Sequence, residues 1–232
     1  MKLAVKQPYL FPYIGYFQVI NIADKYVLFD DVNYINRGWI NRNRILVNNN
    51  IFMFTLPLKN ASQNRLINEI FIADDLKWAD KLLKTIDSAY RKAPMFNTVF
   101  PMIEKIIRNN DKHLSSYINN SIKQICSYLQ IETPIISSSV SYKTGHLKSQ
   151  EKILEICRQE KADIYIDSIG AIELYSKEVF QRHGIKLFFL KSKPVQYSQF
   201  SLEFSPFLSI LDVIMFNERE GISYFLNEYE LI

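Results

Sequence analysis

The first thirty residues contain two short apolar segments, separated by a proline-rich turn and an apolar helix candidate. Leu3 to Val5 form the first segment, which ends at Gln7-Pro8 because proline cannot donate a hydrogen bond within a central strand. Residues 14–23 have the composition of a compact buried helix, and residues 26–29 that of a second buried strand. This order of strand, turn, helix and strand predicts a parallel βαβ unit at the start of the chain.

The remainder of the chain continues to alternate between the two kinds of segment. Strands are expected at 51–58, 67–72, 135–136, 164–166 and 186–190, after a polar excursion at 32–50. Helices are expected at 78–90, 99–109, 113–129, 149–159, 172–183 and 208–216. The pattern predicts one α/β domain over residues 1–232. A mainly parallel sheet would carry helices on both faces, and a helical insertion at about 75–130 could form a separate lobe.

Composition limits the partners and the compartment of the protein. The net charge is +4, but acidic and basic residues are interspersed without a Lys/Arg stripe, so nucleic acid is not an expected partner. Both cysteines, Cys126 and Cys157, fall on apolar helix faces, and the N-terminus lacks the apolar stretch of a signal peptide. No run approaches the roughly 20 apolar residues of a membrane span. We therefore expect a cytoplasmic protein without membrane insertion.

The segment from Gln7 to Phe17 is the first candidate for a binding site. It combines two prolines with several tyrosines at the end of the first strand, where parallel α/β sheets bind their ligands. The prolines stiffen the turn, and the start of the following helix could receive an anion. This interpretation makes Gln7, Tyr9 and Tyr13 binding residues. The alternative is a rigid aromatic turn that only seals the edge of the sheet.

A second candidate segment follows the second strand. It begins with Asp30 and continues into a run that is rich in arginine and asparagine. Arginine suits phosphate and carboxylate ligands because its planar guanidinium group binds them through two parallel hydrogen bonds. The binding candidates in this run are Arg37, Trp39, Asn41 and Arg42. The alternative is a solvated loop whose charges pair with one another, which we favour for Arg44.

Two later positions are also candidates. His146 follows a glycine in a loop after a strand, where it could act as a general base or could simply be exposed. Asp167 ends another predicted strand, where it could bind a ligand or could belong to a tight turn before a helix. Three scattered histidines make a His/Cys metal site improbable, and no motif identifies a cofactor.

Topology predicts that most of these residues converge. A right-handed βαβ unit places the ends of its two parallel strands side by side, so both loops should lie at the same edge of the sheet. The predicted pocket consists of Gln7, Tyr9, Tyr13, Asp30, Arg37, Asn41 and Arg42. His146 and Asp167 would join this pocket only if their strands are neighbours of the first two.

Several segments together resemble the WbqC-like protein family, and the resemblance extends over essentially the whole chain. They are Gln-Pro-Tyr-Leu-Phe-Pro-Tyr-Ile-Gly-Tyr-Phe at 7–17, Asp-Asp-Val-Asn-Tyr at 30–34, Arg-Gly-Trp-Ile-Asn-Arg-Asn-Arg-Ile at 37–45, Thr-Leu-Pro-Leu at 55–58 and Pro-Phe-Leu-Ser-Ile-Leu-Asp at 206–212. Members of that family occur in gene clusters for O-antigen and other surface glycans. The resemblance implies a role in making or decorating an activated sugar.

The opening of the chain also resembles that of nucleotidyltransferase-like domains. Those domains hold phosphates with a His-x-Gly-His turn, whereas this chain has Tyr13-Ile14-Gly15-Tyr16 and no histidine there. The difference removes the usual phosphate-handling groups and puts an ATP-dependent step in doubt.

Three functions follow as hypotheses. The leading one is a transferase of O-antigen (lipopolysaccharide) biosynthesis that adds an acyl or aminoacyl group to the amine of a nucleotide-linked sugar. His146 or Asp30 would be its base. The others are an ATP-dependent ligase or nucleotidyltransferase-like enzyme of the same pathway, and a non-catalytic binding or carrier protein. The expected partner is a nucleotide-linked sugar or another anionic small molecule. The sequence leaves the acyl donor, the cofactor and a homo-oligomeric state open.

Overall fold

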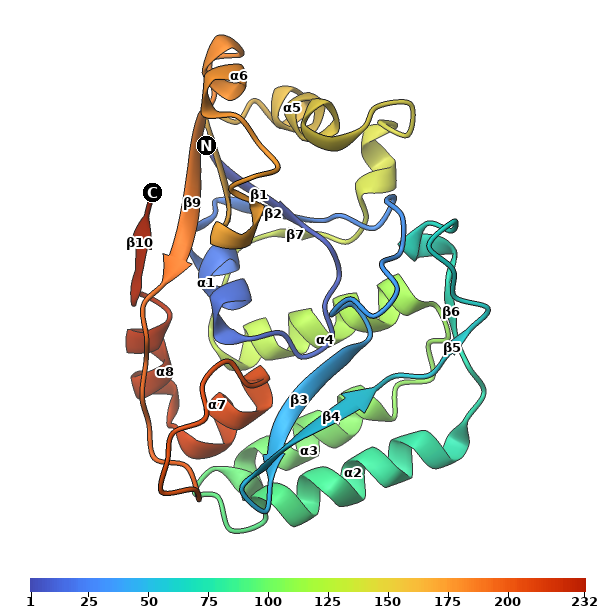
Figure 1. The fold of residues 1–232 in the computed structure, drawn as a ribbon, viewed down its shortest axis with the longest axis vertical. Coiled ribbons are helices and arrows are strands. Elements are labelled where there is room, and N and C mark those ends of the chain that lie inside the picture. The colour runs from blue at the N-terminus through green and yellow to red at the C-terminus, as the bar shows by residue number, and fades with distance from the viewer.

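The computed structural model describes residues 1–232 apart from the side chain of Leu76. Its centre is a six-stranded sheet with the strand order β10-β9-β8-β1-β2-β7 (Figure 1). The five parallel strands are β1 (Lys2–Lys6), β2 (Lys25–Leu28), β7 (Ile135–Ile136), β8 (Ile164–Ser168) and β9 (Lys186–Ser192). Within this sheet, only β10 (Tyr229–Leu231) pairs antiparallel. The prediction of a mainly parallel α/β sheet is confirmed.

Successive side chains of the strands bury themselves in opposite layers, as the two-residue period of a strand requires. In β1, Ala4 joins a hydrophobic cluster with α1 (Ile14–Ile22). Leu3 and Val5 join the cluster on the other face, with α5 (Ser149–Glu160) and α6 (Lys177–Arg182). Helices therefore cover both faces of the sheet, as Figure 1 shows.

The predicted helical insertion contains α2 (Leu76–Tyr90), α3 (Phe96–Ile107) and α4 (Leu114–Tyr128). Buried residues of these helices belong to the same hydrophobic cluster as α1. Two C-terminal helices, α7 (Ile210–Phe216) and α8 (Arg219–Phe225), contribute to that cluster as well. The sequence pattern predicts α7 but neither α8 nor β10.

The polar excursion predicted at 32–50 contains a strand that the sequence analysis missed. β3 (Arg42–Val47) pairs antiparallel with β4 (Asn50–Thr55), and Asn48 and Asn49 connect them. Both asparagines have positive φ angles, 48° and 62°, which suit a tight two-residue hairpin turn. β3 begins with arginine and asparagine, so the sequence there lacks the apolar residues that mark a strand. These polar side chains contact the neighbouring loop or lie outward.

Two further boundaries differ from the predictions. Residues 67–72 divide into a 3₁₀ turn at Ile67–Glu69 and the short strand β6 (Phe71–Ile72), which pairs with β5 (Leu58–Lys59). The helix predicted at 172–183 is confined to α6, because Ser176 caps its first turn by accepting a hydrogen bond from the Val179 amide.

Candidate functional site

Four parallel strands end at one edge of the sheet, and polar residues follow each of them. Gln7 follows β1, Asp30 follows β2, a run of serines at 137–139 follows β7, and Asp167 lies near the end of β8. In the sheet, β2 lies on one side of β1, and β8, which comes later in the chain, lies on the other side. Ligands of open α/β sheets bind at such a reversal of strand order, beyond the carboxyl ends of the strands.

A lysine that the sequence analysis missed lies at this reversal. Lys6 ends β1, and its Nζ donates hydrogen bonds to the Asp167 carboxylate and to Ser168 Oγ, the latter at 2.7 Å. The other carboxylate oxygen of Asp167 accepts a hydrogen bond from the Tyr165 hydroxyl at 2.9 Å. Asp167 is buried and Lys6 is half-buried, so the pair joins β1 and β8 through charges that are partly shielded from water. The predicted binding residue Asp167 therefore lies beside β1.

An aromatic and cationic cluster lies on the two candidate segments. The rings of Tyr9 and Trp39 are 6.1 Å apart, and the guanidinium carbons of Arg42 and Arg44 lie 5.6 and 5.7 Å from the Trp39 ring centroid. Trp39 is 42% exposed and both arginines are half-buried. We call these four residues the Tyr9–Trp39 cluster. The structure places Tyr9 and Arg42 of the predicted pocket in this cluster, together with Trp39, which was predicted as a binding residue outside that pocket, and with Arg44.

Backbone contacts fix the first candidate segment against the second. The Leu10 amide donates to the Ile40 carbonyl at 3.0 Å, and the buried Asn43 side chain donates to the carbonyls of Leu10 and Phe11. Ser209 adds a hydroxyl hydrogen bond to the Phe11 carbonyl at 2.8 Å. Phe11 has a φ of 47°, an unfavourable conformation for an aromatic residue that these contacts hold in place.

Burial keeps the Tyr9 phenol neutral. Burial raises the pKa of Tyr9, and the positive charges of Arg44 and Arg42 oppose that rise without cancelling it. A neutral phenol next to two guanidinium groups can donate or accept a hydrogen bond, while the guanidinium groups can receive an anion. The Tyr9–Trp39 cluster can therefore contact both the hydroxyls and the charged oxygens of a ligand.

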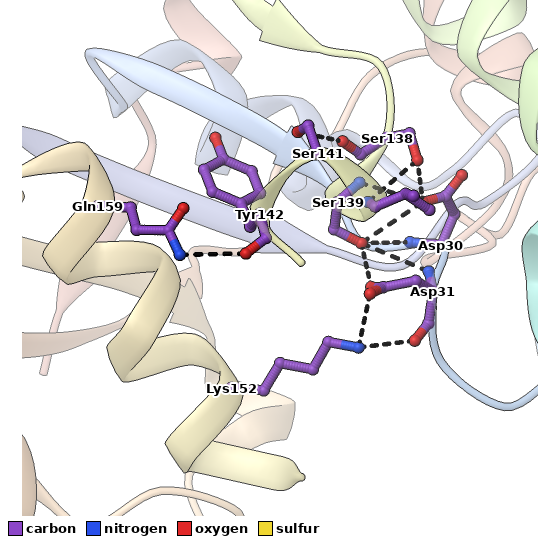
Figure 2. A network of polar contacts seen from close by, with 9 residues as sticks. Asp30, Asp31, Ser138, Ser139, Ser141, Tyr142, Lys152 and Gln159 are labelled. Carbon is purple, nitrogen blue, oxygen red and sulfur yellow. Dashed lines mark hydrogen bonds and ion pairs between the residues drawn. The ribbon is translucent and has the colours of Figure 1, made fainter. Parts of the chain in front are cut away.

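Asp30 belongs to a buried network, shown in Figure 2. Its carboxylate accepts hydrogen bonds from the hydroxyls of Ser115 at 2.6 Å and Ser138 at 2.7 Å, and from the Ser139 amide at 3.1 Å. The neighbouring Asp31 carboxylate pairs with the buried Lys152 of α5 at 2.8 Å. These contacts anchor the segment after β2 to α4, α5 and the end of β7. A ligand could reach the Asp30 oxygens only by displacing one of these donors.

The remaining predicted residues have more ordinary surroundings. Asn41 is buried, where it accepts from the Tyr34 hydroxyl at 2.8 Å and donates to the Leu56 carbonyl at 2.7 Å. Arg37 is exposed, and its carbonyl accepts a hydrogen bond from Arg42. Tyr13 packs edge-on against Phe207 with ring centroids 5.5 Å apart.

Gln7 and His146 complete the predicted set. Gln7 is half-buried, and its carbonyl accepts the Tyr16 hydroxyl at 2.9 Å. His146 is exposed in the loop before α5. The pKa of Glu155 is lowered mainly by the hydrogen bond from Arg158, and His146 adds a smaller effect. In the part of the chain that the structure describes, no three His, Cys, Asp or Glu side chains gather as metal ligands.

The fold and the site define an open α/β protein whose polar and aromatic residues collect beyond the carboxyl ends of its parallel strands. The chain belongs to the WbqC-like protein family, whose sequence model matches residues 7–224. It is 28% identical over 226 residues to a Mycobacterium tuberculosis (strain ATCC 25618 / H37Rv) protein called "Uncharacterized protein Rv1507c", covering 96% of each chain. No solved structure gave a significant match. None of the helices that the structure describes is both long and apolar enough to cross a bilayer.

Proposed function

We propose that the protein is a transferase of bacterial surface-polysaccharide biosynthesis that adds an acyl or aminoacyl group to the amine of a nucleotide-linked amino sugar. The observation that carries the proposal is the Tyr9–Trp39 cluster, which is formed by the loop after β1 and the segment that leads into β3. Two arginines flank one exposed indole ring there. Aromatic faces suit the apolar faces of sugars, and arginine suits the diphosphate of a nucleotide sugar.

Each part of the site then has a role. Arg42 and Arg44 bind the diphosphate, Trp39 contacts the sugar or base, and Lys6 with Asp167 positions the group that extends toward β8. In the reaction the amine attacks the acyl carbonyl, a C–N bond forms, and the leaving group of the donor departs while a base takes the amine proton. His146 is our candidate base, because it is exposed whereas the Asp30 carboxylate accepts four hydrogen bonds from the protein.

One observation favours a second candidate, an ATP-dependent ligase or nucleotidyltransferase-like enzyme. The strand order places β1 between β2 and β8, with Lys6 at the reversal where open α/β sheets bind nucleotides. Lys6 supplies a positive charge near the turn before α1, where this chain has Tyr13-Ile14-Gly15-Tyr16 instead of His-x-Gly-His. In this alternative Lys6, rather than the arginines, would contact the phosphates.

A two-stage experiment separates these functions and a carrier role. Thermal unfolding is first measured with nucleotide-linked amino sugars, ATP and acyl thioesters, because a ligand that binds the native state raises its stability. Bound pairs are then incubated together, and mass spectrometry detects transfer of the acyl mass to the sugar. We expect stabilisation by the nucleotide sugar and transfer from an acyl donor.

The outcomes differ for each function. Stabilisation by ATP with release of pyrophosphate or ADP would replace the transferase by the ligase, and binding without turnover of any pair would indicate a carrier. His146→Ala should lower turnover about 10²-fold or more with unchanged nucleotide-sugar binding. His183→Ala, an exposed histidine after α6, is the matched control and should retain full activity.

A further inference from the structure

Strand β4 exposes a row of large apolar side chains. Ile51 is 58% exposed, Phe52 36% and Met53 43%, and β4 pairs with β3 along only one edge in the described structure. Ile51 and Met53 lie on one face of the strand and Phe52 on the other, toward α2. Isolated exposed apolar residues are common on protein surfaces, but three on the outer strand of one hairpin are not. Such a surface indicates contact with something other than water.

A row of lysines runs along α2 beside this strand. Lys77, Lys81 and Lys84 are spaced four and three residues apart, so they lie on one face of the helix, and all three are exposed. Together with Phe52 they line an open hollow of about 630 Å³. Among the residues that the structure describes, none of the three lysines makes an ion pair. The one acidic residue of the hollow, Asp80, pairs with Arg108.

A second hollow, lined by cations and by the buried Asp212, lies beside the hairpin turn. It has a volume of about 530 Å³, and its lining includes the turn residues Asn48 and Asn49, the cations Arg91 and Lys92, and the exposed ring of Phe200. Ser88 of α2 lines both hollows, so they lie next to each other. Figure 1 shows the β3–β4 hairpin lying across α2 and α3 at the end of the molecule away from α5 and α6.

We infer that this face, formed by β4 and the lysine row of α2, docks on an anionic lipid bilayer. The exposed apolar side chains can enter the boundary of the acyl chains, and the unpaired lysines can contact the negative headgroups. The charge favours this occupant over a second copy of the chain, because two copies would bring their lysine rows together. Met53 lies opposite Arg44 in the hairpin, so docking would hold the Tyr9–Trp39 cluster close to the membrane surface. The protein lies on the bilayer and does not span it.

Vesicle co-sedimentation of the full chain tests the inference. The probes are vesicles of phosphatidylcholine alone, and vesicles with about one part phosphatidylglycerol to three parts phosphatidylcholine, which carry the negative surface potential that attracts lysines. We expect binding to the anionic vesicles only, weakened by salt. The variant Lys81→Glu/Lys84→Glu should lower the partition coefficient about tenfold or more. Ile51→Ser/Met53→Ser should lower it as well, whereas Leu174→Ser, an exposed leucine before α6, should not.

Other outcomes overturn the inference. No binding of the wild-type protein to anionic vesicles, equal binding to neutral vesicles, or unchanged binding of the lysine variant would each do so. Light scattering coupled to size-exclusion chromatography gives the mass in solution. A dimer that Ile51→Ser/Met53→Ser converts to a monomer would assign the face to a second copy of the chain. The lysine variant changes only exposed side chains, so it keeps the test valid if the apolar variant fails to fold.

Discussion

Lys6 shows how a single side chain can define the site without standing out in the sequence. It is one of many lysines, and only the pairing of β1 with β8 places it against Asp167 and Ser168. The sequence pattern did identify Asp167, because an acid at the end of a predicted strand is a recognisable signal. Lys6 could have been found by the same rule, since it is the last residue of the first strand. Lys152 could not, because its position on α5 is indistinguishable from that of a solvated lysine.

Replacement of Lys6 tests this pairing. Lys6→Ala leaves the buried Asp167 carboxylate without its cation, so the free energy of unfolding should fall by about 2–3 kcal/mol, less than for a fully buried pair because Lys6 is half-buried. Lys191→Ala is the matched control: its ion pair with Glu230 is exposed to solvent and should contribute much less. Urea denaturation of both variants gives the comparison. Equal losses would show that the Lys6–Asp167 pair does not join the strands.

Asp212 provides a pH-dependent test at the same scale. This buried carboxylate of α7 accepts hydrogen bonds from Tyr90, Tyr197 and Gln199, yet burial raises its pKa above the usual 3.8. A carboxyl group whose pKa is higher in the folded state favours folding when protonated. Its stabilising effect is therefore present below about pH 3.8 and is lost as the pH rises through the folded-state pKa.

The variant Asp212→Asn lacks this titration. We expect the free energy of unfolding of the wild-type protein to increase relative to that of Asp212→Asn as the pH falls from 7 toward about 4. Urea denaturation at several pH values measures the difference. If the difference in free energy of unfolding stays constant, or falls on acidification, then burial does not raise the pKa of Asp212.

At the scale of elements, the loop between β1 and α1 depends on the hairpin and on α7. The βαβ pattern was recognisable because apolar strand segments and a proline-rich turn are local signals. β3 was not, because Asn43 occupies a buried position in it, where an apolar residue would mark a strand. The Asn43 side-chain amide donates hydrogen bonds to the carbonyls of Leu10 and Phe11. No local sequence pattern reveals these long-range contacts.

Asn43→Ala tests this dependence. The substitution removes the amide donor from both carbonyls and leaves only the Ser209 hydroxyl on that of Phe11, so the free energy of unfolding should fall by about 1–3 kcal/mol. Binding of a nucleotide sugar should weaken as well, because Tyr9 is on the same loop. Asn64→Ala, at an exposed position, should change neither quantity. Calorimetric unfolding and ligand titration of the two proteins provide the measurement.

At the scale of the whole molecule, the sheet order explains which predicted residues meet. Alternating strand and helix segments were sufficient to predict the α/β class, and the right-handed βαβ rule was sufficient to predict that the Gln7 and Asp30 loops share an edge. The position of β8 beside β1 could not be predicted, because strand order depends on pairings between distant segments. That position brings Asp167 to the first strand, whereas His146 lies in the loop that leads to α5.

The central claim is that a nucleotide-linked sugar binds against Trp39, and the chain has only one other tryptophan, Trp78. The direct test is a fluorescence titration of Trp78→Phe, in which Trp39 is the sole indole, and of Trp39→Phe, in which Trp78 is. The account predicts a saturable change in emission for Trp78→Phe, with affinity reduced about tenfold or more by an added Arg44→Ala. Trp39→Phe should show no such change. Saturable binding that alters only the Trp78 emission, or that Arg44→Ala leaves unaffected, would contradict the claim.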